Sequence, residues 1–256
     1  FYNRGYYGSV SHNIKAQYQL YYGWFDGNPA NLNPLPPTAV GKKYVELAGG
    51  PEQLLKQAQK SFDQGEYRWV AELVNHLVFA DPNNQAARQL LADSYEQMGY
   101  QAESGPWRNF YLTGAKELRH GVAALPTPTT ITPDMIGGLS TELFFNYLAM
   151  KFKGTDPQAS QLKYNFNISL PDVDEKIALL INNGVVNPRF GSTVTKDVTA
   201  TITVNRADLN LMTLGQITFP DMLKTGKIKI EGNADAFKQF FSKLDNFKFW
   251  FNIVEP

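Results

Sequence analysis

The stretch from Ala80 to Tyr100, ADPNNQAARQLLADSYEQMGY, decides the architecture of the middle of this 256-residue chain. It opens with Asp81-Pro82-Asn83-Asn84, a composition typical of a turn. The residues that follow place apolar side chains three or four positions apart, namely Ala87, Leu90, Leu91 and Tyr95. That spacing predicts an amphipathic helix over residues 85–99.

Two similar segments precede this helix, over residues 53–62 and 68–80. Gly65 and Gly99 are 34 residues apart, as are Ala58 and Ala92. The string and its period resemble a tetratricopeptide repeat, in which a small residue lets two helices approach. About one and a half repeats are visible, and roughly three make an independent solenoid. We therefore expect another helix, such as 104–119, or another subunit to cover the remaining apolar faces.

The flanking segments are of a different kind. Residues 1–48 are aromatic and rich in turns, with short helices expected over 13–22 and 38–47. Residues 122–133 contain three prolines and four threonines, which is typical of a linker. Residues 134–256 predict an α+β domain, with an Asn-Gly hairpin turn at 182–184. In that domain we expect strands over 163–170, 176–182, 198–204 and 227–232, helices over 134–152, 206–213, 218–225 and 234–244, and an extended stretch over 247–251.

Composition excludes several classes of protein. Lys and Arg together equal Asp and Glu, at 24 each, so no overall field attracts nucleic acid or an anionic membrane. The chain has no cysteine, which excludes disulfides and thiolate metal sites. No run of 18 apolar residues is present, so we predict no membrane span. Phe1 is not an initiator Met and no signal-peptide pattern follows it, from which we expect further sequence upstream.

Three segments carry a resemblance to one family. They are RGYYGSVSHN (4–13) with GWFDGNPANL (23–32), GYQAESGPWRN (99–109), and LNLMTLGQITFPDMLKTGKIKIEGNADAFKQFF (209–241). In this order they resemble the C-terminal part of the alkyl sulfatases of the metallo-β-lactamase superfamily. The resemblance implies the end of a catalytic domain over 1–48, a helical dimerisation domain over 49–121, the linker 122–133, and a sterol-carrier-like α+β domain over 134–256.

The family resemblance also implies a function. A complete enzyme of this kind hydrolyses long-chain alkyl sulfates, such as dodecyl sulfate, to an alcohol and sulfate. This chain would supply the homodimer contact and bind the alkyl tail, working with an upstream catalytic domain. A bacterial periplasmic or secreted location would fit the resemblance. The alternative is a non-catalytic lipid- or surfactant-binding protein with a repeat-type interaction module.

His12 is the candidate metal ligand. The family is a two-zinc hydrolase, and its Ser-His-Asn loop maps onto Ser11-His12-Asn13, while its main His-x-His-x-Asp-His motif is absent from this chain. A catalytic zinc needs about three protein ligands, so His12 alone cannot hold one. We expect the isolated chain to be inactive. His76 and His120 fall in helical segments and are interpreted as structural.

Side chains near His12 are candidate substrate contacts. A sulfate ester is anionic, and Arg4, Tyr6, Tyr7 and Asn13 offer guanidinium, hydroxyl and amide donors. Packing of the loop is the alternative. Trp107, Arg108 and Asn109 could line the mouth of the same site or simply pack a helix.

The α+β domain offers a candidate site for an apolar ligand. Adaptable and bulky apolar residues exceed what two short helices need, and they suit an alkyl-chain tunnel. They are Met212, Leu214, Ile217, Phe219, Met222 and Leu223. Binding should depend on chain length and hardly on the head group, because no Arg or Lys cluster lines these helices. An ordinary core is the alternative.

Overall fold

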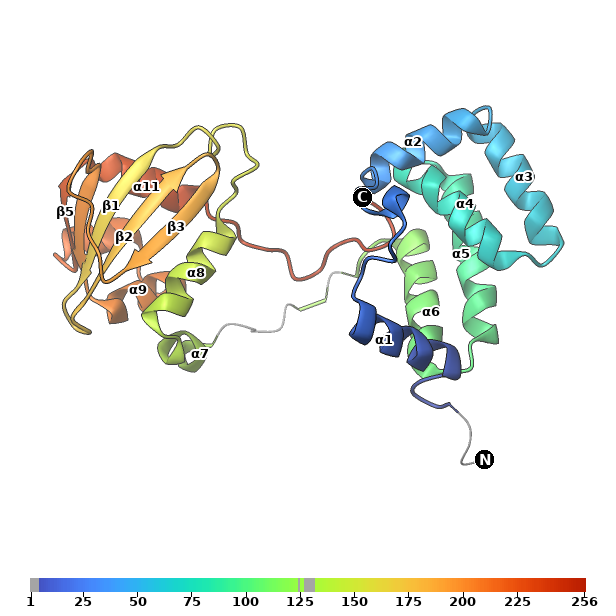
Figure 1. Ribbon diagram of the computed structural model, residues 1–256, viewed down its shortest axis with the longest axis horizontal. Coiled ribbons are helices and arrows are strands. Elements are labelled where there is room, and N and C mark those ends of the chain that lie inside the picture. The colour runs from blue at the N-terminus through green and yellow to red at the C-terminus, as the bar shows by residue number, and fades with distance from the viewer. Residues whose placement is uncertain (1–4, 124, 127–131) are drawn as a thin grey trace. The chain divides into compact units, whose positions relative to one another are not determined.

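A computed structural model describes residues 5–123, 125–126 and 132–256. The chain divides into two compact units (Figure 1). Unit 1 combines residues 1–126 with the last seven residues, 250–256, and unit 2 is residues 127–249. Helices followed by an α+β domain are confirmed as the fold. Residues 5–48 lie in the same unit as the helices that follow, and so do residues 250–256.

Unit 1 is built from helices joined by short turns. Its described elements are α1 (Val10–Tyr22), the 3₁₀ turn η1 (Pro29–Asn31), α2 (Pro37–Leu47), α3 (Pro51–Asp63), α4 (Tyr67–Ala80), α5 (Gln85–Gln101) and α6 (Gly105–His120). The helix pairs that pack most closely are α2 with α4, α3 with α4, α4 with α5, and α5 with α6. Side-chain caps start the last two of these helices, because the Asn84 and Ser104 oxygens accept backbone N–H groups of Ala87 and Trp107.

Small residues lie where the helices of unit 1 come closest. Ala58 and Ala92, the pair 34 residues apart, are fully buried. A side chain at Gly99 would lie 2.9 Å from Leu112 Cδ2, and one at Gly41 would lie 2.5 Å from the backbone oxygen of His76. Gly41 therefore brings α2 against α4, which places α2 in the helical unit.

Unit 2 is a five-stranded sheet with helices. Its described elements are α7 (Pro133–Gly138), α8 (Thr141–Lys151), β1 (Tyr164–Leu170), β2 (Glu175–Asn182), β3 (Val185–Phe190), β4 (Ala200–Val204), α9 (Arg206–Thr213), α10 (Phe219–Lys224), β5 (Ile228–Gly232) and α11 (Ala234–Ser242). The strand order is β3-β2-β1-β4-β5, and only β1 and β4 pair in parallel. Asn183 and Gly184 both have positive φ, as the predicted hairpin turn requires.

Two predictions for unit 2 were wrong in detail. The single helix expected over 134–152 is two helices, because the chain leaves helical geometry at Leu139 and Ser140 caps α8. Residues 247–251, expected to be an extended stretch, are interrupted by a bend at Phe249 and Trp250. The alternating apolar residues do not pair with the sheet, because the chain passes from unit 2 to unit 1 at Trp250.

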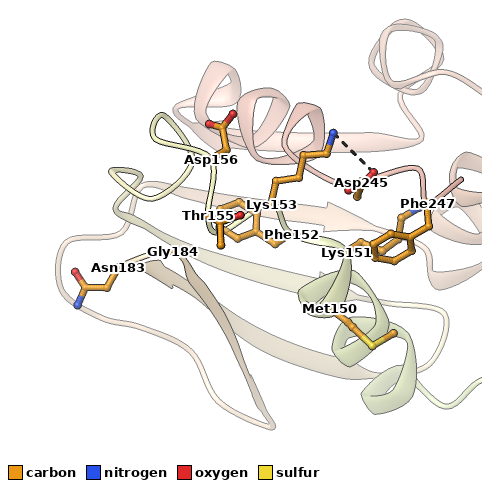
Figure 2. A pocket seen from close by; sticks show the side chains of 11 residues that line it. Met150, Lys151, Phe152, Lys153, Thr155, Asp156, Asn183, Gly184, Asp245 and Phe247 are labelled. Carbon is orange, nitrogen blue, oxygen red and sulfur yellow. Dashed lines mark ion pairs between the residues drawn. The ribbon is translucent and has the colours of Figure 1, made fainter. Parts of the chain in front are cut away.

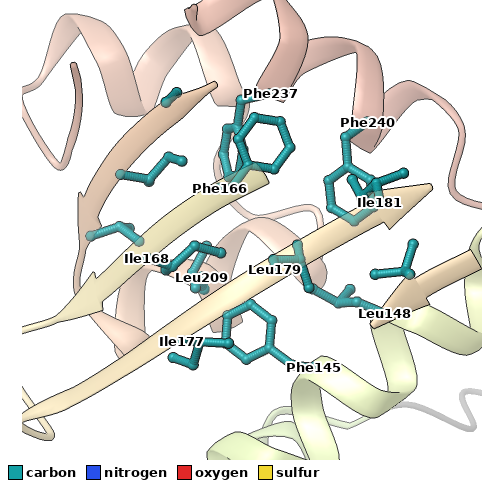
Figure 3. Close-up of a cluster of buried hydrophobic side chains, with 14 of the residues drawn as sticks. Phe145, Leu148, Phe166, Ile168, Ile177, Leu179, Ile181, Leu209, Phe237 and Phe240 are labelled. Atoms are coloured by element: carbon teal, nitrogen blue, oxygen red, sulfur yellow. The ribbon is translucent and has the colours of Figure 1, made fainter. Parts of the chain in front are cut away.

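The core of unit 2 lies on one face of the sheet. Alternate residues of β1, β2 and β4 point to this face and are buried, among them Phe166, Ile177 and Ile202. Helices α8, α9 and α11 contribute Phe145, Leu209, Phe237 and Phe240 to the same cluster (Figure 3). In Figure 1, α11 lies behind the strands.

Candidate functional site

The loop before α1 is attached to the start of α6. The backbone N–H of Gly105 donates to the Tyr6 carbonyl oxygen at 2.9 Å, and the Gly5 N–H donates to Glu103 Oε1 at 3.3 Å. Ser9 then starts α1, because its Oγ accepts the His12 N–H at 3.2 Å. Two elements separated by about a hundred residues in sequence thus position His12.

The His12 ring is held by Trp107 of α6. Trp107 Nε1–H donates to His12 Nδ1 at 2.9 Å, and the two rings meet edge to face at 6.1 Å. A neutral imidazole has one bare nitrogen and one N–H. The bare nitrogen is therefore Nδ1, and Nε2 carries the proton. Coordination of a metal through either nitrogen of the neutral ring requires this hydrogen bond to break.

The described residues do not form a metal centre. Within residues 5–123, 125–126 and 132–256, no three His, Cys, Asp or Glu side chains lie close enough to share an ion. His76 stacks on Tyr44 with ring centroids 4.0 Å apart, and His120 is the last residue of α6. Burial lowers the pKa of His76 below its ordinary value, with the Glu72 carboxylate opposing the shift.

The other candidate substrate contacts are only partly gathered around His12. Arg4 lies outside the described residues. Tyr7 is 86% exposed, while the Tyr6 backbone reaches α6. A Cβ added at Gly8 would lie 2.8 Å from Asn13 Oδ1, so the Asn13 amide packs against the loop at Gly8.

A cavity of about 280 Å³ lies beside the His12–Trp107 pair. Its walls come from the start of α1, the start of α4, the end of α5, the α5–α6 connection and the start of α6, and they include Ser9, Met98, Glu103, Trp107 and Tyr111. Trp107 was one of the open candidates from sequence. Met98 and Glu103 were missed, and no signal in the sequence joins the end of α5 to residues 9–11.

Four of the six apolar residues expected to form a tunnel are packed as core, whereas Leu223 is exposed. Met222 is fully buried, and Met212, Ile217 and Phe219 pack against the same cluster. The void enclosed between β1, β2, α8, α9 and α11 measures about 10 Å³. That is about the space for one water molecule, so an alkyl chain does not fit there without rearrangement. The ordinary-core alternative therefore holds for Met212, Ile217, Phe219 and Met222.

A larger, open pocket of about 800 Å³ lies at the end of α8 (Figure 2). Apolar surface comes from Met150, Phe152 and Phe247, and positive charge from Lys151 and Lys153. Lys153 forms an ion pair with Asp245, with Nζ and Oδ1 3.7 Å apart. Phe152 also contacts Phe240, with centroids 6.0 Å apart, and Phe240 lines the interior void. A pair of aromatic rings therefore separates the open pocket from the interior.

Arg206 at the start of α9 is an unexpected buried cation. Its guanidinium carbon lies 3.8 Å from the centre of the Phe144 ring, and Nη2 donates to the Leu139 carbonyl oxygen at 3.4 Å. Among the described residues, Nε and Nη1 have no hydrogen-bond partner. Burial lowers the pKa of the Arg206 guanidinium, and the Asp172 and Glu175 carboxylates oppose that shift.

Comparison with known protein families covers the chain from end to end. The family described as "Alkyl sulfatase dimerisation" matches residues 1–121, and the family described as "Alkyl sulfatase C-terminal" matches residues 129–256. The chain belongs to the alkyl sulfatase family. The dimerisation match spans the helices of unit 1, and the C-terminal match spans unit 2 and the last seven residues.

Curated alkyl sulfatases match the whole chain but are much longer than it. A linear primary-alkylsulfatase from a Pseudomonas species is 52% identical over 256 residues, which are 100% of this chain and 38% of that protein. An alkyl/aryl-sulfatase of Saccharomyces cerevisiae is 44% identical over 99% of this chain and 38% of its own length. The solved structure of a stereoselective inverting sec-alkylsulfatase from a Pseudomonas species is 42% identical, with a TM-score of 0.84 over 99% of this chain and 39% of that one.

The matches cover the whole of this chain but only part of each relative. The chain spans about 38% of the length of these curated relatives. Within the described residues, no helix has the length and apolar character to cross a membrane.

Proposed function

We propose that this chain works as part of an alkyl sulfatase, a sulfuric ester hydrolase that converts long-chain alkyl sulfates such as dodecyl sulfate to an alcohol and sulfate. The observation that carries the proposal is the match of two alkyl sulfatase domains, in order, over residues 1–121 and 129–256. The relatives named for this activity add support at 52% and 44% identity.

An upstream catalytic domain of the metallo-β-lactamase type is the partner we propose for α1. None of the residues of α1 is buried. Its large apolar side chains are exposed, namely Val10, Ile14, Tyr18, Leu20, Tyr21 and Tyr22. So large an exposed apolar surface on one helix is typical of a contact with another domain.

Zinc, expected as two ions, remains a proposal for the complete enzyme. The residues of this chain do not fit a zinc site by themselves, because the described part holds no three-ligand cluster and His12 Nδ1 is engaged by Trp107. We keep His12 as the one ligand from this chain, with the remaining ligands outside it.

Activity and zinc content of the protein with its upstream domain test these proposals together. The longer protein should release sulfate from dodecyl sulfate, and the chain alone should not. His12→Ala in the longer protein should lower both zinc content and turnover, while the control His120→Ala should change neither. Unchanged zinc content in His12→Ala would refute the ligand assignment, and turnover by the chain alone would refute the dependence on upstream residues.

Self-association is proposed for the helices of unit 1. The family description names dimerisation, and Phe110 on α6 is 77% exposed. A two-fold interface of this kind would bury more than about 1,000 Å². Sedimentation should show a dimer that Phe110→Glu weakens and the control Lys116→Ala, on the same helix, does not. A monomer at micromolar concentration would count against a homodimer.

Alkyl-tail binding is proposed for unit 2, and it is the role that the alternative, a non-catalytic surfactant-binding protein, would share. The open pocket beside Phe152 supports it, since apolar Met150 and Phe247 lie next to Lys151 and Lys153. Burying a twelve-carbon tail gains about 0.8 kcal/mol per CH₂ before the costs of ordering. Micromolar affinity is therefore reasonable.

Titration of the chain with dodecyl sulfate, dodecanol and a short alkyl sulfate tests this role. A steep loss for the short chain is expected. The lysines add a modest preference for the sulfate head group, which Lys151→Met should remove. Absence of saturable binding below the micelle concentration would refute it.

A further inference from the structure

The last seven residues of the chain are bound by the helical unit. Trp250–Pro256 belong to unit 1, although residues 127–249 before them form unit 2. Val254 packs against the core of the helices. A side chain on Gly114 of α6 would lie 3.2 Å from Val254 Cγ1, so the glycine leaves room for the segment.

Glu117 of α6 binds the backbone of this segment. Glu117 is 7% exposed, and its Oε1 accepts hydrogen bonds from the backbone N–H groups of Ile253 at 2.7 Å and Val254 at 2.9 Å. A buried carboxylate is costly unless hydrogen bonds satisfy it. Two successive backbone N–H groups of the tail do so here, because the chain bends at Ile253 and Val254, and this contact recognises the bent backbone irrespective of those two side chains.

Arg88 of α5 binds a side chain of the segment. Its guanidinium contacts both carboxylate oxygens of Glu255, and the two side chains are 13% and 10% exposed. Backbone carbonyls hold the guanidinium in place, because Nε donates to Leu118 O at 3.0 Å and Nη1 to Pro82 O at 3.1 Å. A bidentate Arg–carboxylate pair is specific in geometry as well as strong.

We propose that the groove between α5 and α6 is a peptide-binding site of the helical unit, and that its ligand is the chain's own C-terminal segment. The site selects a peptide that bends at two successive residues and in which an apolar residue precedes an acidic one, as Val254 precedes Glu255. Its role is to attach unit 2 to the helices at a second point. The first attachment is the segment that continues from the end of α6 at His120, one turn beyond Glu117.

Simple packing of a chain end is the competing explanation. It requires only that Val254 be covered, and it gives Glu117 and Arg88 no special role. The two explanations differ in what happens when a carboxylate is replaced by its isosteric amide, because that change preserves shape and apolar contact.

Amide hydrogen exchange on the intact chain separates them. In the unmodified protein the amides of Ile253 and Val254 should exchange much more slowly than in a free peptide of residues 250–256. Glu255→Gln and Glu117→Gln should each speed that exchange by about tenfold or more, the factor expected for loss of a charge-assisted hydrogen bond. The matched control is Arg119→Met, which removes the ion pairs of α6 with Asp93 and Glu96 and should leave the tail amides unchanged.

Glu255→Gln keeps the experiment decisive, since it lies in the tail and leaves the helices intact. Exchange at free-peptide rates in the unmodified protein would overturn the docking, and unchanged protection in both Gln variants would overturn the recognition. A chain ending at Phe249 should also bind an acetylated peptide of residues 250–256 saturably, and the peptide with Glu255→Gln about tenfold more weakly or worse. Equal binding of the two peptides would likewise refute the proposed selectivity.

Discussion

Replacing Gly41 by Ala tests whether α2 packs on α4 as a part of the helical unit. In an open helix position this substitution stabilises, because Ala is favoured over Gly by about 1 kcal/mol. Here the added Cβ would lie 2.5 Å from the His76 backbone oxygen and 3.3 Å from the Ala80 nitrogen. The outcome therefore depends on which of two opposing effects is larger.

The steric effect should prevail. An ordinary carbon–oxygen contact needs roughly 3.2 Å or more, so the two helices must separate by about 0.7 Å. The clashing oxygen belongs to the backbone of α4 and cannot turn away as a side chain would. Overpacking of this kind costs about 1–3 kcal/mol, which exceeds the gain in helix propensity. We expect Gly41→Ala to lower the free energy of unfolding by about 1–2 kcal/mol.

Tryptophan fluorescence during urea unfolding measures this effect in the helical unit alone. The four tryptophans, Trp24, Trp69, Trp107 and Trp250, all belong to unit 1. With a urea dependence of about 2 kcal/mol per molar, the midpoint should fall by about 0.5–1 M. The control Lys42→Ala lies on the exposed side of α2 and should stay within about 0.5 kcal/mol of the parent. A midpoint that rises by the amount expected from propensity would show that α2 is not packed on α4.

Three further substitutions have defined outcomes. Phe240→Ala should lower the free energy of unfolding of unit 2 by about 3–5 kcal/mol, because removal of a fully buried ring next to a void of about 10 Å³ leaves a cavity. Urea unfolding followed by circular dichroism measures this loss, and a loss below about 1 kcal/mol would refute the packing. Arg206→Met should be neutral or stabilising in the same assay, because Nε and Nη1 of the buried guanidinium have no hydrogen-bond partner among the described residues, and a large loss of stability would reveal one. His76 has a pKa lowered by burial, so its protonation favours unfolding: stability of unit 1 should be full above about pH 6.5 and decline below it, and His76→Gln should flatten that decline.

The sequence predicted elements with strong local signals well. The helices over α3 to α6 followed from apolar periodicity and from turn residues, and the hairpin followed from Asn183-Gly184. The break at Leu139 was missed because apolar residues continue through it at helical spacing. The weaker local signal, Ser140 followed by an acidic first turn, is what starts α8.

The contacts that build the candidate sites could not be predicted in the same way. The His12–Trp107 hydrogen bond joins residues 95 apart, and the Glu117–Val254 bond joins residues 137 apart. Neither pair has a local pattern, since each depends on how two elements pack. The tunnel prediction failed for a related reason: composition gives the amount of apolar surface around Met222 but not whether neighbouring rings fill the space.

Helix α6 joins the two sites that these long-range contacts form. Its first turn carries Trp107, which holds His12, and its last turn carries Glu117, which holds the C-terminal segment. A helix of 16 residues spans about 24 Å, and its hydrogen-bonded backbone moves largely as one body. Any displacement of α6 therefore acts on the loop of the candidate metal ligand and on the docked tail at the same time. Phe110 is exposed on the same helix, so a partner subunit that contacts it would also affect the Trp107 and Glu117 contacts. A variant that weakens the dimer should therefore also be measured in the tail-exchange experiment.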